Sequence, residues 1–291
     1  MRLEHNKSEK EYEQCLDILS EWADTQKHFP EKPDRYILRY VLLSNKFSIE
    51  RSKEKLDMYY SVRNLMPEIF SKHPLSPEFI KESRVNYAIP MPKPGPGYKR
   101  IVYCQHNPEF GAEYFYPEKF LIHILHVAEL IFHTDDCCNY HFIYDCNGLT
   151  LGHVPRFSLV VMKKVGFLLD KVFSNRMASI YVVNFHPYME HIVNHFFKPF
   201  LIPKLRERFY VHAGTDILLE VFGKSHMPKD IGGDEPSLAE LNDVLLKTFE
   251  KYKDRFDKIQ GMKVDEDLRP EKLENDEILG FYGNFRNISV D

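Results

Sequence analysis

The chain has 291 residues, of which 43% are hydrophobic and 28% are charged, and its formal net charge is −4. This balance is typical of a globular protein with one large domain or two modest ones. The net negative charge argues against a nucleic-acid-binding protein, whose affinity depends on broad neutralisation of phosphates. Aromatic usage is uneven, with 22 Phe and 17 Tyr against 1 Trp. Phe rings suit the lining of an apolar pocket, but they also fill ordinary cores, so composition does not decide between the two.

The amino-terminal sequence carries no apolar run of the kind that a secretory signal requires. No stretch of the chain approaches the ~20 apolar residues that span a bilayer. Five cysteines are present, and a disulfide between the adjacent Cys137 and Cys138 would be strained. We therefore expect a cytoplasmic protein with reduced thiols.

The first part of the chain has the periodicity of helices. Residues 9–28 and 34–70 place apolar side chains at helical spacing between charged ones. Ser48 is a candidate N-cap inside the second stretch, and Pro67 is expected to end the helical block. We predict an all-helical N-terminal domain over residues 1–85.

Residues 90–97 contain four prolines. Because this segment cannot join a helix or a central strand, we predict that it is a stiff connection. Beyond them, short apolar strands alternate with helices. The predicted strands cover 100–104, 141–145, 179–183 and 209–212, and the predicted helices cover 120–132, 155–173, 188–200, 216–222 and 237–258. Strands separated by helical crossovers imply a parallel sheet and an α/β fold. We place this domain over residues 86–250 and a charged C-terminal tail over 251–291.

The predicted helix 188–200 has an unusual pattern. Apolar pairs recur every four residues from Tyr188 to Leu201, which gives the helix one wide apolar face. Pro199 interrupts the backbone ladder, and the basic residues Lys204, Arg206 and Arg208 follow. Such a segment covers a cavity, lies in a membrane interface, or is an ordinary crossover helix, and periodicity alone leaves these open.

Signals for catalysis are weak. Residues 123–141 are rich in His, Cys and acidic side chains, but no HExxH or CxxC spacing occurs. Glycine-rich phosphate loops and a GxSxG nucleophile motif are also missing. Asp145 ends a predicted strand and is either a catalytic carboxylate or part of a tight turn. We expect no enzyme activity, no cofactor, no metal and no catalytic residue.

Several segments resemble one known family when they are taken in order. The chain resembles the CRAL-TRIO family, in the branch that contains tocopherol-transfer and retinaldehyde-binding proteins, and especially its arthropod-type members. The resemblance is carried by residues 142–148, 180–184, 198–201, 204–208 and 228–233. It implies an α/β lipid-binding fold, with a mostly parallel sheet as floor and a helical lid over about residues 186–201, preceded by a helical domain.

The resemblance also implies two sets of site residues. Basic residues that grip a phosphoinositide head group correspond to Arg176, Lys204 and Arg208. Two further basic positions of the branch are occupied here by Leu42-Leu43 and by Ala178. Residues implied to contact the ligand are Ile124, Ala128, Phe142, Tyr144, Phe157, Val161, Val165, Leu168, Leu169, Phe173, Ile180, Met189, Val193, Phe196, Phe197 and Phe200.

The function implied by the resemblance is non-enzymatic. The protein is expected to bind a tocopherol, retinoid, carotenoid or other terpenoid and to transfer it between membranes, as a monomer that visits anionic, phosphoinositide-containing surfaces transiently. No nucleic-acid partner is expected. The alternatives are a phosphoinositide or phospholipid exchanger, a lipid-regulated scaffold protein, and, least supported, a thiol-dependent enzyme that acts on lipid.

Overall fold

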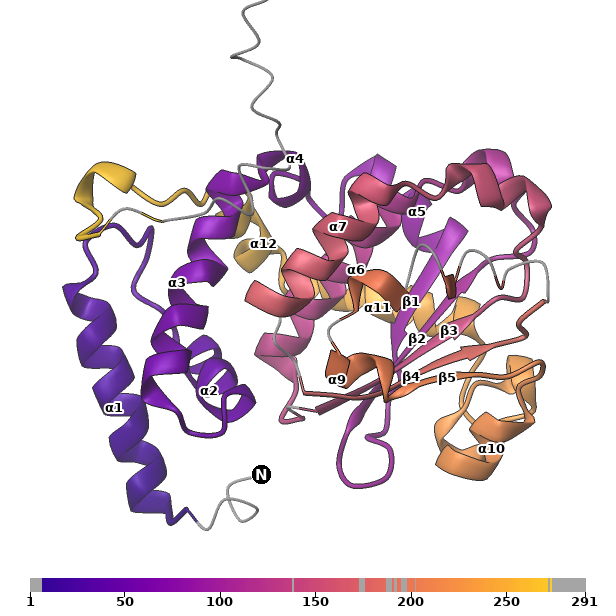
Figure 1. Cartoon of the computed structure of the whole chain (residues 1–291), viewed down its shortest axis with the longest axis horizontal. Helices are drawn as coiled ribbons and strands as arrows, with labels where there is room; N and C mark the ends of the chain where they lie inside the picture. Colours follow the sequence, from indigo (N-terminus) through magenta and orange to yellow (C-terminus); the bar gives the residue numbers. More distant parts are fainter. Residues whose placement is uncertain are drawn as a thin grey trace, which may run out of the picture.

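The computed structural model describes residues 7–137, 139–172, 176–186, 190, 193–194, 198–201, 203–271 and 273. The helices within residues 9–65 gather at one side of the molecule, and a twisted five-stranded sheet with its covering helices forms the other (Figure 1). The predicted α/β class, with a helical region before a mostly parallel sheet, is confirmed.

The N-terminal region is built from five helices in place of the two long stretches predicted. Lys46 and Phe47 have positive φ values of 57° and 64°, and this turn separates the second helix from the third. Pro67 begins the fourth helix, where a missing amide hydrogen costs nothing. The helices are α1 (Glu9–Thr25), α2 (Arg35–Ser44), α3 (Ile49–Leu65), α4 (Pro67–Phe70) and α5 (Pro77–Val85).

The sheet has the strand order β1-β2-β3-β4-β5, in which only the β1–β2 pair is antiparallel. The four predicted strands are present, whereas β1 was not predicted because prolines crowd the segment that follows it. An edge strand tolerates Pro90 at its end, since no central ladder is interrupted. The strands are β1 (Asn86–Pro90), β2 (Arg100–His106), β3 (Asn139–Asp145), β4 (Arg176–Val183) and β5 (Phe209–Val211).

Alternation along the strands gives the sheet two different faces. Tyr140, Phe142 and Tyr144 share one face of β3, and His141 and Asp145 share the other. A register shift in the pairing of β3 with β4 leaves Ala178 as an extra residue. Because of this bulge, Met177 and Ile180 reach the same face although they are three positions apart, and Ala178 lies inside the strand and not ahead of it.

The helices after β2 and β3 cover the face that carries Phe142. The prediction of one continuous helix over 155–173 is wrong, because the α-helix begins later and does not continue to the end of this range. Pro155 lies inside a 3₁₀ helix, and the α-helix begins only after Ser158 and widens into a π-helix. The elements are α6 (Pro117–Thr134), the 3₁₀ helix Leu151–Arg156, α7 (Leu159–Phe167) and the π-helix Leu168–Val172. The predicted helix 188–200 lies largely outside the described residues.

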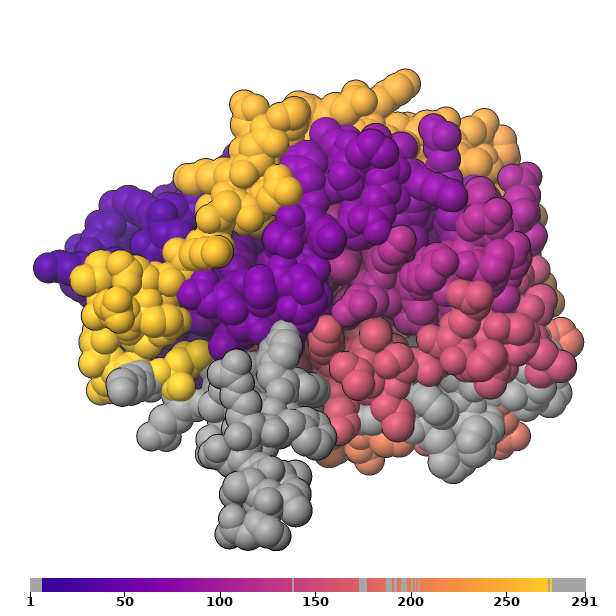
Figure 2. All heavy atoms as spheres, turned by 90° about the horizontal axis from the view of Figure 1, so that it is seen from above, coloured from indigo at the N-terminus to yellow at the C-terminus, as the bar shows by residue number. Residues whose placement is uncertain are grey.

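The C-terminal part returns to the N-terminal helices. The predicted helix 237–258 is two helices, which meet at Tyr252. Figure 2 shows the residues from about 253 to 271, drawn in yellow, lying along the N-terminal helices. Arg269 binds Asp57 at 2.7 Å, which fixes this packing. The remaining helices of the described ranges are α9 (Pro203–Arg206), α10 (Asp216–Phe222), α11 (Leu238–Lys251), α12 (Lys253–Gln260) and the 3₁₀ helices Ala112–Tyr114, Lys198–Phe200, Lys224–His226, Lys229–Ile231 and Glu266–Leu268.

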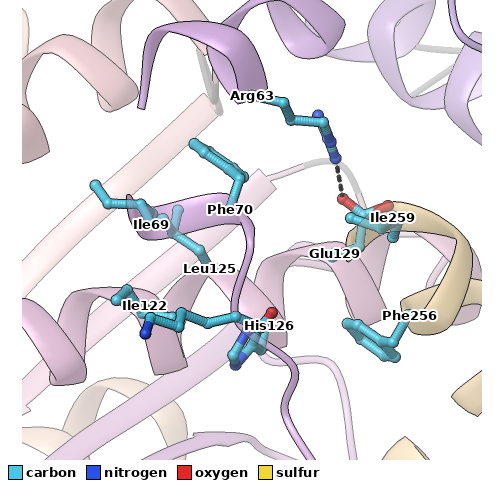
Figure 3. A pocket seen from close by; sticks show the side chains of 10 residues that line it. Arg63, Ile69, Phe70, Ile122, Leu125, His126, Glu129, Phe256 and Ile259 are labelled. Atoms are coloured by element: carbon cyan, nitrogen blue, oxygen red, sulfur yellow. Dashed lines mark hydrogen bonds and ion pairs between the residues drawn. The ribbon is translucent and has the colours of Figure 1, made fainter. Parts of the chain in front are cut away.

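Glu129 of α6 is the buried centre of a charge network that joins these parts. It accepts hydrogen bonds from Tyr59 at 2.6 Å, from Arg63 at 3.3 Å and from Arg255 at 3.4 Å. Arg255 also donates to Glu31 at 2.8 Å. Figure 3 shows Arg63 reaching Glu129 above a cavity of about 20 Å³, which has room for one water molecule and not for a lipid.

We predict that Glu129→Ala destabilises the fold by roughly 3–5 kcal/mol, because it leaves the buried Arg63 guanidinium without its carboxylate and leaves Arg255 with Glu31 alone. Denaturant unfolding measures this change. Lys253→Met is the matched control, since the Lys253–Asp257 pair on α12 is exposed and should contribute little. Equal stability losses in the two variants would contradict the assigned role of Glu129.

Candidate functional site: an apolar cavity

An apolar cavity of about 230 Å³ lies between the sheet and the helices that follow β2 and β3. An apolar cavity of ~150 Å³ is large enough to take up benzene, so this one has room for a larger molecule. The described lining contains no charged side chain. A site of this kind recognises its ligand mainly by shape and apolar contact.

The floor of the cavity is the apolar face of the sheet. Phe142 and Tyr144 of β3 lie on it, and Ile180 lies on the adjacent strand β4. These three residues belong to the predicted site, and the alternation of the strands brings them together. Val102 and Val182 share this face and were missed, although the same alternation could have identified them.

The helical wall contains most of the other predicted residues. On α6, Ile124 and Ala128 are one turn apart and face the cavity. Further predicted residues along this wall are Phe157, Val161, Val165, Leu168, Leu169 and Val193. Leu168 and Leu169 are the first two residues of the π-helix, and both line the cavity. A π-helix has a wider turn than an α-helix.

Five predicted contacts are not placed by the structure. Phe173, Met189, Phe196 and Phe197 lie outside the described residues. Phe200 belongs to a 3₁₀ helix, but its side chain lies outside the described part. Lining residues that the prediction did not include are Val102, Phe115, Pro117, Phe120, Leu121, Leu125, Val127, Ile131, Phe132, Tyr140, Cys146, Met162, Met177, Val182, Leu201 and Phe209.

Few hydrogen-bonding groups reach the cavity wall. Tyr140, Tyr144 and Cys146 are the described lining residues with a hydroxyl or thiol. Burial raises the pKa of the Cys146 thiol to about 12 and raises the pKa of Tyr144 well above its usual value. Both groups are therefore neutral at physiological pH. A thiolate nucleophile at Cys146 is not favoured.

Asp145 lies on the opposite face of the sheet and has a structural role. Its carboxylate accepts hydrogen bonds from the Tyr103 hydroxyl at 2.6 Å and from the Gln105 amide at 3.0 Å. It also accepts from the Asn184 amide at 2.8 Å and from the backbone N–H of Asn147 at 2.8 Å. Of its two proposed roles, these four bonds favour the turn over the catalytic carboxylate.

The histidine-rich segment does not converge on one point. His141 meets the Ser179 hydroxyl at 2.6 Å, and His133 meets Asp34 at 3.1 Å. Asp135 pairs with Arg100 at 2.5 Å. Within the described part of the chain, no group of three or more His, Cys, Asp or Glu side chains is arranged to hold a metal ion.

The predicted phosphoinositide residues lie at the edge where parallel strands begin. Arg176 is the first residue of β4, and Arg208 directly precedes β5. The Ile180 amide donates to the Arg208 carbonyl at 2.8 Å, which holds the two strands together. Lys204 is on α9, which packs against β4. The side chains of Arg176 and Lys204 are outside the described part, and the Arg208 guanidinium donates to the Met177 carbonyl at 2.8 Å.

The two positions where the branch has basic residues, Leu42-Leu43 and Ala178, carry no positive charge here. Leu42 is fully buried among the N-terminal helices, and Ala178 is the bulged residue of β4. No helix in the described ranges has the length and apolar character needed to cross a membrane.

Comparison with known proteins identifies both regions of the chain. A Pinta-like UBA domain model matches residues 8–79, and a CRAL/TRIO domain model matches residues 86–233. Among solved structures, the crystal structure of Sfh5 matches with 12% sequence identity and a TM-score of 0.49, covering 83% of this chain and 97% of that chain. The CRAL/TRIO match spans slightly more than half of the 291 residues, and the chain therefore belongs to the CRAL/TRIO family of lipid-binding domains.

Proposed function

We propose that the protein binds one small hydrophobic molecule, of the tocopherol, retinoid, carotenoid or other terpenoid kind, and transfers it between membranes. The observation that carries this proposal is the apolar cavity of about 230 Å³ between the sheet and the helices α6 and α7. Family membership supports a lipophilic ligand. Each large apolar group that leaves water on entering such a cavity contributes roughly 1.5–3 kcal/mol to binding.

The proposal includes a membrane-facing surface near α7. Leu159 and Val160 are 49% and 54% exposed at the start of this helix, and Lys163 lies one turn further on. Exposed apolar side chains beside a cation favour insertion at the surface of an anionic bilayer. Because α7 packs against the 3₁₀ helix Lys198–Phe200, this surface adjoins the segment that leads to Lys204 and Arg208.

The main alternative is a phospholipid or phosphoinositide exchanger, in which a head group also enters the cavity. That alternative is less supported, since the described lining offers no charged side chain to a phosphate. Mass spectrometry of lipid extracted from the purified protein separates the two, because a bound phospholipid would be detected directly.

We predict that Ala128→Phe weakens binding of the apolar fluorescent probe N-phenyl-1-naphthylamine at least tenfold. A phenyl ring needs much of the available volume, since ~150 Å³ holds benzene. Fluorescence titration measures the loss, and a thermal melt checks folding. The matched control is Val244→Phe, which adds the same ring at a position that is 59% exposed on α11. Unchanged probe affinity in a folded Ala128→Phe protein would refute the ligand site.

We predict that Lys204→Ala/Arg208→Ala slows transfer to vesicles containing phosphatidylinositol bisphosphate by about thirtyfold, since the two cations together contribute ~2 kcal/mol near an anionic surface. Affinity for the ligand and transfer to neutral vesicles should stay nearly unchanged. Transfer is followed by fluorescence after rapid mixing.

The control for this experiment is Lys247→Ala/Lys251→Ala, which removes two cations from α11 without changing the start of the sheet. A loss of ligand affinity that matches the loss of transfer rate would contradict the division between cavity and docking surface.

A further inference from the structure

The side chains that line the cavity are almost all hydrocarbon. A hydrogen-bonding group without a partner in this lining is therefore a candidate contact for a polar group on the ligand. Two described lining residues, Tyr140 and Tyr144, carry hydroxyl groups. The Tyr140 hydroxyl donates to the carbonyl oxygen of Cys137 at 3.0 Å and is therefore occupied. The Tyr144 hydroxyl has no hydrogen-bond partner among the residues that the structure describes.

Tyr144 is fixed in place by its surroundings. It lies on β3, the middle strand of the five, and shares the cavity face with Phe142. The centre of its ring is 6.2 Å from the centre of the Phe120 ring. Burial raises its pKa well above the usual value, so the hydroxyl stays protonated and can both donate and accept.

A phenylalanine would supply the same ring at this position without the polar atom. A hydroxyl that is held away from water in an apolar cavity without a partner costs roughly 1–3 kcal/mol, so packing alone does not favour tyrosine over phenylalanine at this position. A molecule inside the cavity can supply the missing partner. An alcohol, phenol or carbonyl group on a bound lipophile has the required chemistry.

We propose that Tyr144 forms a hydrogen bond with the polar group of the ligand, and that it selects lipophiles with one neutral hydrogen-bonding group over pure hydrocarbons. This inference rests on the proposed function, because it assigns the ligand class of the same cavity. Tyr144 is then the residue that orients the ligand, with the polar group beside the Tyr144 hydroxyl and the hydrocarbon part against the apolar lining.

The test compares an isoprenoid alcohol with its hydrocarbon counterpart, farnesol with farnesene. Both displace N-phenyl-1-naphthylamine from the wild-type protein and from Tyr144→Phe. We expect the substitution to weaken farnesol binding two- to tenfold, the worth of one hydrogen bond. Farnesene binding should be unchanged or tighter, and the thermal stability of the empty protein should not fall, since an unpaired hydroxyl has been removed.

Tyr140→Phe is the matched control, because it removes a lining hydroxyl that is already bonded to Cys137. It should lower stability and leave the ratio of the two affinities unchanged. An equal change in both affinities in Tyr144→Phe, or a loss of stability without a change in their ratio, overturns the inference while the proposed function stands. Failure of both compounds to bind the wild-type protein overturns the proposed function itself.

Discussion

The constraint on which this structure depends is the cost of keeping an apolar cavity open. Atoms that line an unfilled space lose contacts that a packed interior would provide. At ~24 cal/mol for each Å³, a dry cavity of 230 Å³ costs roughly 5 kcal/mol. This amount is comparable to the whole net stability of many domains. The rest of the fold must therefore hold the walls apart, and a ligand that fills the space stabilises the folded state.

The N-terminal helices contribute to holding the walls. The Lys55 ammonium of α3 donates to the backbone carbonyls of Asp170 and Lys171, in the π-helix of the cavity wall. Lys164 of α7 binds Glu68 at 2.9 Å and Glu118 at 3.0 Å. The Lys55 bonds and the Lys164–Glu68 pair cross from the N-terminal helices to the helical wall of the cavity, whereas the Lys164–Glu118 pair joins α7 to α6 within that wall. The N-terminal helices and the cavity wall are therefore in direct contact, although the family models divide the chain between them.

Sequence patterns predicted the elements with strong periodicity and missed those set by tertiary context. The strands around Phe142 and Ile180 were identifiable because both their apolar alternation and their flanking helices are regular. Strand β1 was not, since its pairing with β2 is a long-range property and prolines follow it. The bulge at Ala178, which turns Met177 toward the cavity, likewise exists only through pairing with β3. Pocket residues on regular faces could thus be predicted, and those that depend on register could not.

The two faces of the sheet show how one strand can serve stability and ligand binding at once. On the outer face, Asp145 satisfies four donors, so the end of β3 is fixed without any help from the cavity. On the inner face, Tyr144 is held by that same strand yet keeps its hydroxyl free of partners among the described residues. A rigid strand lowers the entropic cost of presenting a polar group to a ligand. The rest of the lining contacts a ligand through apolar side chains. A single hydroxyl held by a rigid strand therefore gives a bound lipophile one preferred orientation.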